Sequence, residues 1–363
     1  MVVGYRERPN GRIEVVPRRH RPELVEGHAS SSSWTRRFYL TMTIYFITGG
    51  FGFLGQHIVK AIHEHDPGAE LRILGRTQRT TLLGVENLEN VRWVQGDLSK
   101  PETFKAELKD VDTIVHNAAL VSFRRSDADA IFQSNVVGTH NLVQAALNAG
   151  CSNFIFISSI SALEFNHNGI TDESMIPDLE YKSRHDMYGY SKVVSEMELK
   201  ELADRMRVIV LNPSVVLGPG SERIEAVTRM ARFLPVVPML SYINSFVDVR
   251  DVARAVVLSL TEGRSGERYI ITAHNVDMLA FTRATLNAAG KHPLFFPVTG
   301  AGVRSLDAIL WLMDLLKLNP GIRRPSDMAV NKNLSWEKIR REMGWEPRFP
   351  LEQSISDSIS GNE

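Results

Sequence analysis

Residues 43–55, Thr-Ile-Tyr-Phe-Ile-Thr-Gly-Gly-Phe-Gly-Phe-Leu-Gly, are the stretch that decides the fold. The first five are β-branched or aromatic, which is typical of a buried parallel strand. A glycine-rich turn follows, and residues 56–65 then carry apolar side chains at helical spacing. A strand, a glycine turn and a helix in this order predict a dinucleotide site, because backbone N–H groups at a helix N-terminus bind a pyrophosphate.

The glycines of this turn have the spacing Gly49-x-x-Gly52-x-x-Gly55. Glycine allows a tight turn and a close approach of the backbone to the pyrophosphate. We expect Gly49, Gly52 and Gly55, together with Phe53 and Leu54, to form the cofactor site. A glycine-rich turn also occurs for purely structural reasons, so the prediction depends on the motifs further along the chain.

The end of the second expected strand, residues 71–74, bears on the choice of cofactor. In NAD enzymes an acidic residue about 20 positions past the last glycine binds the ribose 2′-hydroxyl. Here Gly75 takes that position and Arg76 follows it, with Arg79 nearby. A guanidinium binds a 2′-phosphate, which a carboxylate would repel, so the sequence favours NADP over NAD. The alternative is that Arg76 is a solvated loop residue that stacks on adenine.

Two further strands are expected at residues 91–94 and 112–115. After the first, Asp97 either accepts a hydrogen bond from the adenine amino group or caps the next helix. After the second, His116 is predicted to be structural, and the small residues that come next let a cofactor lie against the backbone. From these two segments we assign the following residues to the cofactor site: Asp97, Leu98, Asn117, Ala118 and Ala119. The repeated strand and helix patterns predict an α/β fold with a Rossmann-type, doubly wound parallel sheet.

The residues that carry chemistry come after a fifth expected strand, residues 153–157, which ends in Ser158-Ser159. Tyr188 and Lys192 are four positions apart and therefore share one face of a helix. An ammonium beside a phenol favours the phenolate and lowers the pKa of the phenol. Such a pair suits proton exchange with a carbonyl or alcohol, and a serine hydroxyl can hold the same oxygen.

With these residues in place, the sequence resembles the extended short-chain dehydrogenase/reductase superfamily from about residue 43 to residue 359. No single motif is specific, but all of them occur in the family's order. The motifs are Thr48-Gly49-x-x-Gly52-x-x-Gly55, Gly96-Asp97-Leu98, His116-Asn117-Ala118-Ala119, Asn135-Val136-x-Gly138-Thr139, Ser158-Ser159, Tyr188-x-x-Ser191-Lys192, Asn212-Pro213-x-x-Val216-x-Gly218-Pro219, Phe246-Val247-Asp248-Val249-x-Asp251-Val252-Ala253 and Gly344-Trp345-x-Pro347.

The resemblance implies a role for each matching residue. Tyr188 would be the catalytic acid/base, and Lys192 would lower its pKa and bind the nicotinamide ribose. Ser159 would polarise the substrate oxygen, and it is preferred over Ser158 because the family's catalytic serine is usually the second of the pair.

Two further residues belong to the expected site. Asn135 would support the active-site helix and its water, with helix capping as the alternative, and Pro213 would contact the cofactor. The sequence departs from the family at residues 182–187, where many relatives carry a proline. We expect this segment to be a loop that contacts the substrate.

The resemblance leaves three functions open. Leu211-Asn212-Pro213-Ser214 and Arg76 favour an NAD(P)-dependent alcohol/carbonyl oxidoreductase similar to 3β-hydroxysteroid dehydrogenases and dihydroflavonol reductases. Arginines at 223, 229 and 232 could instead bind the diphosphate of a nucleotide sugar, as an epimerase or dehydratase requires. A non-catalytic NADP-binding regulator is the third function, but such relatives typically lack the Tyr-x-x-x-Lys pair.

Composition excludes several other classes of protein. The 363 residues have a formal net charge of zero, so no overall field attracts nucleic acid or an anionic membrane. Cys151 is the single cysteine, so no intrachain disulfide or cysteine-rich metal cluster is expected, and the compartment is predicted to be the reducing cytoplasm. No apolar run is long enough to span a membrane. The apolar segment 308–318 is expected to pack within the protein, with contact to a membrane surface or a lipid substrate as the alternative.

The first 41 residues differ from the rest, with eight arginines, no lysine and a run of four serines. Such a segment buries too little apolar surface to offset its ordering entropy. We therefore expect residues 1–42 to form a disordered tail, with Met42 as the native start.

The remaining chain is expected to form two parts. Residues 43–216 would form the NAD(P)-binding Rossmann domain, joined by a later strand near residues 245–247. Residues 217–363 would form a smaller substrate-binding lobe. By analogy with relatives, the protein would dimerise through helices that include the one bearing Tyr188. Helices are expected at residues 226–233, 251–261, 279–289, 305–318 and 336–343.

Overall fold

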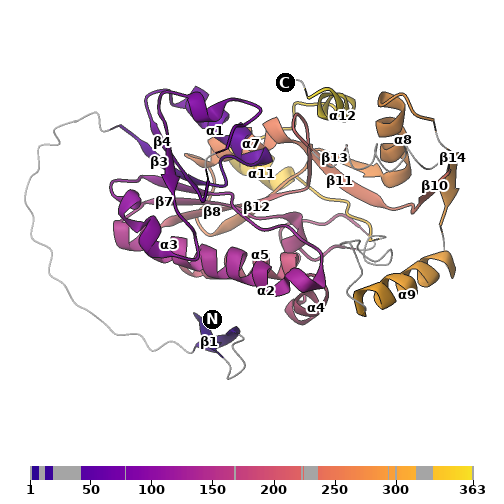
Figure 1. The fold of residues 1–363 in the computed structure, drawn as a ribbon, viewed down its shortest axis with the longest axis horizontal. Coiled ribbons are helices and arrows are strands. Elements are labelled where there is room, and N and C mark those ends of the chain that lie inside the picture. The colour runs from indigo at the N-terminus through magenta and orange to yellow at the C-terminus, as the bar shows by residue number, and fades with distance from the viewer. Residues whose placement is uncertain are drawn as a thin grey trace, which may run out of the picture.

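The computed structural model describes most of the chain and centres on a seven-stranded parallel sheet (Figure 1). The strand order is β12-β8-β7-β6-β3-β4-β5. The strands are β3 (Ile44–Thr48), β4 (Glu70–Gly75), β5 (Val91–Gln95), β6 (Thr113–His116), β7 (Asn153–Ile157), β8 (Arg207–Pro213) and β12 (Glu267–Ile271). The described residues are 2–7, 13–18, 42–77, 79–166, 169–221, 224, 236–292, 294–298, 301–315 and 330–361.

The order of the strands reverses between β3 and β6, since the chain builds outward from β3 in one direction and then from β6 in the other. In open parallel sheets a ligand binds outside the carboxyl ends of the strands at such a reversal. The fold therefore places the site beyond the ends of β3 and β6, where the glycine turn and the His116-Asn117 segment lie.

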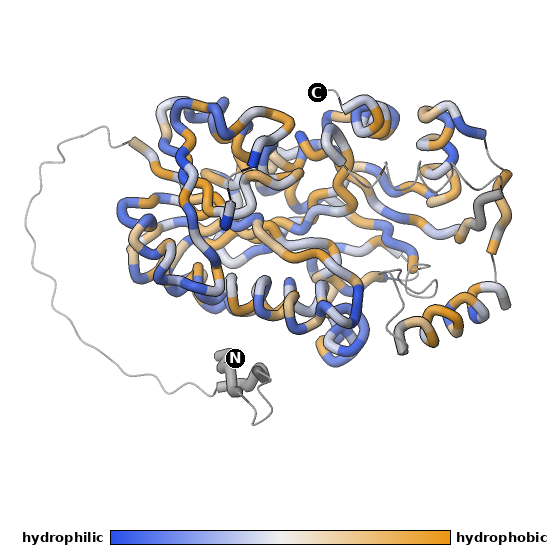
Figure 2. Tube along the Cα trace, in the orientation of Figure 1, coloured by the Kyte–Doolittle hydropathy of each residue, from blue (hydrophilic) through white to orange (hydrophobic). Residues whose placement is uncertain are grey.

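Helices cover both faces of this sheet, as the doubly wound architecture requires. Alternate side chains of each strand point to opposite faces, so Phe46 and Ile47 belong to two different hydrophobic cores. One core contains residues of α1 (Phe53–His65), α7 (Val249–Ser259) and α11 (Glu337–Met343). The other contains residues of α3 (Gly138–Ala149) and α5 (Met187–Glu201). Figure 2 shows the apolar residues concentrated along the central strands.

The second part of the molecule has its own small core, formed by Leu217, Phe246, Phe281 and Ile355 among others. Its three-stranded sheet has the order β13-β11-β9, and a parallel pair of strands lies at the far end of the lobe in Figure 1. The elements are β9 (Val215–Leu217), β10 (Val236–Met239), β11 (Ile243–Asp248), β13 (His274–Asp277), α8 (Met278–Ala288), β14 (Leu294–Pro297), α9 (Ala301–Leu315) and α12 (Leu351–Ser360).

One expected strand assignment was wrong. The strand near residues 245–247 is part of β11, which pairs with β9 and β13 and does not join the central sheet. Polar residues of β11 have partners in the lobe: Ser245 donates to Asn275 Oδ1 at 2.5 Å. The strand that joins the central sheet is β12, which pairs with β8. Residues Tyr269–Ile271 of β12 are fully buried. The chain thus returns to the first domain through α7 and β12.

The expected helices at 251–261, 279–289, 305–318 and 336–343 correspond to α7, α8, α9 and α11. The one at 226–233 lies outside the described residues, as do the arginines at 223, 229 and 232. Helix α12 was not expected, because its sequence is rich in serine. Helix α4 (Leu179–His185) occupies most of the segment expected to be a substrate loop. Short helical segments are α2 (Ala128–Ile131), a π-helical turn at Phe132–Val137 and a 3₁₀ turn at Ile160–Ala162.

The N-terminal segment contains a difference from expectation. Strands β1 (Val2–Glu7) and β2 (Ile13–Arg18) pair as an antiparallel hairpin, where we expected a tail without regular structure. Both strands are rich in β-branched residues, and the sequence between them contains Asn10-Gly11, a pair favoured in hairpin turns. Residues 19–41 lie outside the described residues, so their disorder stays a prediction.

Within the described ranges, no helix is long and apolar enough to cross a membrane. Helix α9 nevertheless exposes large apolar side chains, with Ile309, Trp311 and Leu312 each about half exposed. The sequence predicts that this segment packs within the protein. Such packing covers only part of its apolar surface.

Candidate active site

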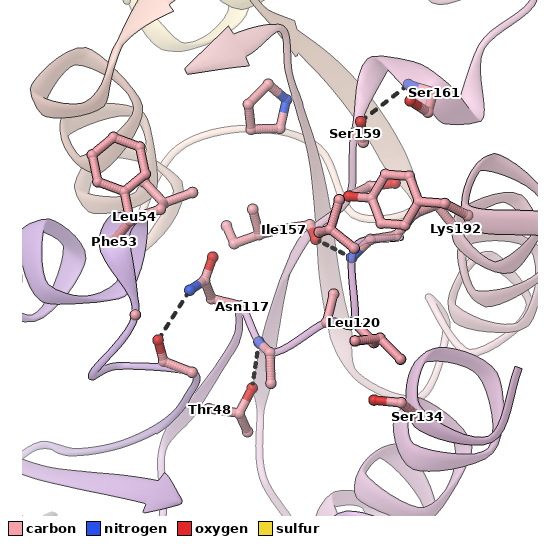
Figure 3. Close-up of a pocket in the computed structure, with 18 of the residues that line it drawn as sticks. Thr48, Phe53, Leu54, Asn117, Leu120, Ser134, Ile157, Ser159, Ser161 and Lys192 are labelled. Carbon is pink, nitrogen blue, oxygen red and sulfur yellow. Dashed lines mark hydrogen bonds between the residues drawn. The ribbon is translucent and has the colours of Figure 1, made fainter. Parts of the chain in front are cut away.

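A cleft of ≈1180 Å³ lies at the carboxyl ends of the central strands and reaches into the second lobe. Most of the predicted site residues line it: Gly49, Gly52, Phe53, Leu54, Arg76, Asp97, Leu98, Asn117, Ala118, Ala119, Ser159, Tyr188, Lys192 and Pro213. Gly55 and Asn135 do not line it. Figure 3 shows the central part of the cleft, with the start of α1 on one side and Lys192 on the other.

The glycine turn packs too closely for any side chain. Gly49 has a φ of +69°, and a Cβ added there would lie 2.8 Å from the backbone nitrogen of Ala118. A Cβ on Gly55 would lie 1.9 Å from the carbonyl oxygen of Gly49. Gly55 therefore acts by letting α1 start against the turn rather than by lining the cleft.

The N-terminus of α1 faces the cleft through Phe53 and Leu54. Gly52 is its N-cap and offers no side chain to the first free N–H groups. These donors suit the pyrophosphate of a dinucleotide, since a helix N-terminus favours negative charge. The residues present therefore fit a dinucleotide cofactor.

Hydrogen bonds join the turn to the segment after β6, as Figure 3 shows. Thr48 Oγ1 accepts from the backbone nitrogen of Ala118 at 3.0 Å, and Asn117 Nδ2 donates to Gly49 O at 3.2 Å. His116 lies behind them and is structural, as predicted. It is buried between Thr48 and Thr139, and burial lowers its pKa to about 3. Its side chain does not line the cleft, and both ring nitrogens have hydrogen-bond partners inside the fold.

After β4, Arg76 and Arg79 line the cleft with exposed side chains. Asp97 also lines it, and its Oδ1 accepts from the backbone nitrogen and hydroxyl of Ser99 at 2.9 and 2.8 Å. These hydrogen bonds lower the pKa of Asp97. The next helical turn has Lys100 as its N-cap, so the capping alternative for Asp97 is wrong.

Tyr188 and Lys192 lie on the first turns of α5, and both line the cleft. The helix begins where the Asp186 side chain accepts from the backbone nitrogen of Gly189 at 3.0 Å. The Tyr188 ring is largely buried and meets the Phe123 ring edge-on, with centroids 6.1 Å apart. Both rings of this contact belong to the cleft wall, which fixes the direction of the phenol.

Lys192 is 2 % exposed, and its Nζ donates to the carbonyl oxygen of Ile157 at 2.8 Å (Figure 3). The ammonium also lies 4.6 Å from the centre of the Phe156 ring. Burial lowers the pKa of Lys192 to about 7, and the nearby charge of Glu196 opposes that change. The cleft therefore contains a poorly hydrated ammonium on the tyrosine's helix.

The two serines after β7 differ in their surroundings. Ser159 Oγ accepts from the backbone nitrogen of Ser161 at 3.1 Å and is half-buried at the cleft wall (Figure 3). The Ser158 hydroxyl is buried and donates to Glu196. Of the two, Ser159 has the hydroxyl that a bound molecule could reach.

Asn135 was placed in the cofactor site by the sequence, and the structure places it behind that site. It lies in the π-helical turn, and its amide donates to Leu120 O and Ser191 Oγ while accepting from Leu120 N. Its neighbour Ser134 lines the cleft instead. Asn135 therefore joins the cleft wall to α5, and the capping alternative is also wrong because its side chain caps no helix.

The segment expected to be a substrate loop contributes little to the cleft. Of residues 182–187, Asp186 lines it, whereas Lys182 is buried and donates to Ser161 O at 2.9 Å. The cleft is also lined by residues that the sequence did not single out: Leu120, Val121, Phe123, Phe165, Tyr242, Asn244 and Lys332. No local motif marks them, because they come from separate segments.

The described residues contain no group of three or more histidine, cysteine, aspartate or glutamate side chains that could hold a metal ion. Cys151 is buried away from the cleft, and burial raises the pKa of its thiol to about 11.

Fold and cleft together define a Rossmann-type dinucleotide-binding protein with a Tyr-x-x-x-Lys pair. The chain belongs to the NAD dependent epimerase/dehydratase family, whose model matches residues 45–272, and it is an enzyme of the extended short-chain dehydrogenase/reductase type. The resemblance inferred from the sequence is thereby confirmed.

Individual relatives cover almost the whole chain. A Synechocystis protein that carries a dihydroflavonol 4-reductase name is 29 % identical over 87 % of this chain and 93 % of its own length. The 3β-hydroxysteroid dehydrogenase/Δ5→4-isomerase of Mycobacterium tuberculosis is 27 % identical over 86 % and 88 %. The structure of DesIV, a dTDP-glucose 4,6-dehydratase from Streptomyces venezuelae with NAD and TYD bound, matches with a TM-score of 0.70 at 21 % identity, over 88 % and 96 %.

Proposed function

We propose that this enzyme interconverts an alcohol and a carbonyl compound with a nicotinamide dinucleotide as the hydride carrier. The observation that carries the proposal is the buried Lys192 on the same helix as Tyr188, at the wall of a cleft that begins with the glycine turn. Several relatives are named dehydrogenases or reductases, which supports an oxidoreductase over a nucleotide-sugar epimerase.

In this proposal the chain's own residues bind the substrate oxygen and move its proton. The hydroxyl groups of Ser159 and Tyr188 hold the oxygen, and Tyr188 donates or removes the proton as the acid/base. The ammonium of Lys192 favours the phenolate, since opposite charges close together stabilise the charged form. When bound, the nicotinamide ring supplies or accepts the hydride.

We also propose NADP rather than NAD as the cofactor. Arg76 and Arg79 are exposed at the cleft wall after β4, where Gly75 stands in place of the acidic residue that would bind a ribose hydroxyl. A guanidinium binds a phosphate bidentately, so Arg76 is the expected partner of the 2′-phosphate. We propose that the cleft-lining residues of the sequence motifs contact the cofactor. Gly55 contributes indirectly, because it lets α1 start against the glycine turn.

An apolar substrate fits the part of the cleft wall next to Tyr188. Leu120, Val121 and Phe123 are each more than a third exposed there, which is costly unless a ligand covers them. Ketosteroids and dihydroflavonols are apolar carbonyl compounds of this kind. The cytoplasmic location and the homodimer remain predictions from the single cysteine and from family analogy.

The test is a panel in which NADPH or NADH oxidation is followed with ketosteroids, dihydroflavonols and aldehydes, and with UDP-sugars as the contrast. We expect turnover with an apolar carbonyl compound and NADPH. Arg76→Ala should lower kcat/KM for NADPH roughly tenfold, and that for NADH far less, because one charged hydrogen-bond pair is lost. Conversion of a UDP-sugar without net change in cofactor would show an epimerase instead.

A further inference from the structure

Behind the cleft, one buried carboxylate contacts all the elements that carry the proposed chemistry. Glu196 lies one helical turn after Lys192 on α5, and its side chain is 9 % exposed. It accepts from the hydroxyl of Ser158, at the end of β7, and from Asn212 Nδ2, at the end of β8, the latter at 2.6 Å. The sequence motifs include both donors, but Glu196 itself stands outside them.

The same contacts reach the proposed substrate-binding serine. Asn212 Nδ2 also donates to the carbonyl oxygen of Ser159 at 3.0 Å, so Glu196 and Ser159 share one amide. On its other side, Glu196 lies 3.5 Å from the Arg268 guanidinium of β12. Arg268 is held in turn by the carbonyl oxygens of Glu173 and Met175. The carboxylate thus has hydrogen-bond partners from three strands.

We propose that Glu196 is a positioning residue for the Tyr188–Lys192 pair, because its carboxylate fixes α5 against the ends of β7 and β8 and places a negative charge one helical turn from Lys192. This inference rests on the proposed function for its catalytic meaning. Glu196 touches neither cleft nor substrate, and it acts through Ser158, Asn212 and Lys192.

The electrostatic effect of Glu196 on Lys192 depends on the other groups around Lys192. Tyr188 faces it from α5 and His116 from β6, whereas β7 offers the Ile157 carbonyl and the Phe156 ring. The remaining charge nearby is Glu196, backed by Arg268 of β12. Burial lowers the pKa of Lys192, and Glu196 raises it. Removal of the carboxylate charge therefore shifts the pKa of Lys192 further down.

The chain offers a matched control on the same helix. Glu198 is two residues further on and is hydrogen-bonded to His140 Nδ1 at 2.6 Å, on the side of α3. Glu198→Gln removes one carboxylate from α5, as Glu196→Gln does, but not beside Lys192. Glutamine at 196 keeps an oxygen that can accept from Ser158 and Asn212, so this variant retains those two hydrogen bonds and removes the charge together with the ion pair to Arg268.

The primary measurement needs no turnover. The Lys192 ammonium is titrated by NMR in full-length protein with ¹³C-labelled lysine, and its signal is assigned with Lys192→Met. We expect Glu196→Gln to lower the pKa of Lys192 by about one unit or more, and Glu198→Gln to leave it within roughly 0.3 unit. An unchanged Lys192 pKa in Glu196→Gln, or the same change in both variants, overturns the proposal.

Turnover provides the second readout. In Glu196→Gln the alkaline limb of the kcat profile should move to lower pH, with kcat about tenfold lower at pH 8 and substrate KM unchanged. Glu196→Asp keeps the charge but not the reach, so kcat should fall without movement of the limb. If Glu196→Gln does not fold, the test is made with Glu196→Asp. A Lys192 pKa near the wild-type value together with a reduced kcat supports the proposal. A wild-type kcat, or a large fall in the pKa of Lys192, overturns it.

The two proposals can fail separately. A wild-type enzyme without nicotinamide-linked turnover contradicts the proposed function. If the pKa of Lys192 still depends on Glu196 in that protein, the electrostatic effect of Glu196 on Lys192 is supported even though the proposed function is not.

Discussion

The Lys192 side chain is buried in apolar surroundings. Its ammonium is buried beside the Phe156 ring and donates to one carbonyl oxygen, that of Ile157, while Glu196 is one turn away. Removing an ammonium from water costs several kcal/mol, which partial compensation by nearby groups reduces. A hydrophobic residue of similar length would be cheaper to bury, so the lysine must contribute something other than stability.

This cost leads to a prediction about stability and pH. Burial lowers the pKa of Lys192 from 10.5 to about 7, so between these values the unfolded chain binds the proton more tightly than the folded one. The destabilisation is complete below pH 7 and disappears as the pH approaches 10.5. Lys192→Met should therefore raise the free energy of unfolding of the cofactor-free protein by roughly 1–4 kcal/mol at pH 6, and by much less at pH 10.

Urea unfolding at the two pH values measures this, with Lys200→Met as the control, because Lys200 is an exposed lysine on the same helix. The prediction is wrong if the Lys192→Met protein is no more stable than wild type at pH 6. It is also wrong if the increase in the free energy of unfolding is the same at both pH values.

The start of α1 forms one wall of the cleft and is proposed to bind the cofactor. The close packing of Gly55 against Gly49 O leaves no room for a methyl group. Gly55→Ala must move either the turn or the helix, and the N–H groups that face the pyrophosphate move with it. We expect NADPH binding to weaken tenfold or more, which corresponds to about 1.4 kcal/mol or more.

Gly68 provides the control for this prediction. It follows α1, and a Cβ there would meet nothing closer than Asp66 Oδ1 at 3.9 Å. Fluorescence titration of NADPH into Gly55→Ala and Gly68→Ala compares the two. Equal affinities in both variants would show that the packing of the turn does not shape the site.

Elements with strong periodicity were predictable from the sequence. Strand β7 was predicted at its observed bounds, because five residues of buried β-rich sequence are bounded by polar residues. Helix α12 was missed because Leu351 and Ile355 are the main apolar contacts among its serines. Strand β11 was expected in the central sheet, and β12, which joins that sheet, was not predicted, because the choice of strand partner depends on contacts in the folded protein.

The same limit applies inside the site. Tyr188, Lys192 and Ser159 belong to motifs and were found from the sequence. Asn135 also belongs to a motif, yet its amide bonds Leu120 and Ser191 behind the cleft, which spacing along the chain does not reveal. Glu196 could have been found, since a helix places it one turn after Lys192.

For the whole molecule, the cleft forms where the reversal of the strand order meets the second lobe. Tyr242, Asn244 and Lys332 reach the cleft from that lobe, although they are far from Tyr188 in the sequence. Their placement depends on how the two parts of the chain pack, so their part in the cleft was not predictable from the sequence.

No described residue N-terminal to Thr48 lines the cleft. A protein that starts at Met42 should therefore keep kcat/KM within about twofold of the full chain, since terminal segments with few contacts to the fold tolerate removal. Steady-state kinetics on both proteins, with circular dichroism to confirm folding, checks this. A folded but inactive shortened protein would show that the N-terminal segment takes part in catalysis.

Tyr188→Phe isolates the proposed proton transfer between Tyr188 and the substrate, because the variant loses one oxygen from a ring held by Phe123. The measurement is kcat with the best carbonyl substrate of the panel, beside the Kd for NADPH in the same protein. We expect a kcat lower by about 10²–10⁴-fold, with NADPH affinity nearly unchanged. Turnover at the wild-type rate in Tyr188→Phe would contradict the proposed proton transfer.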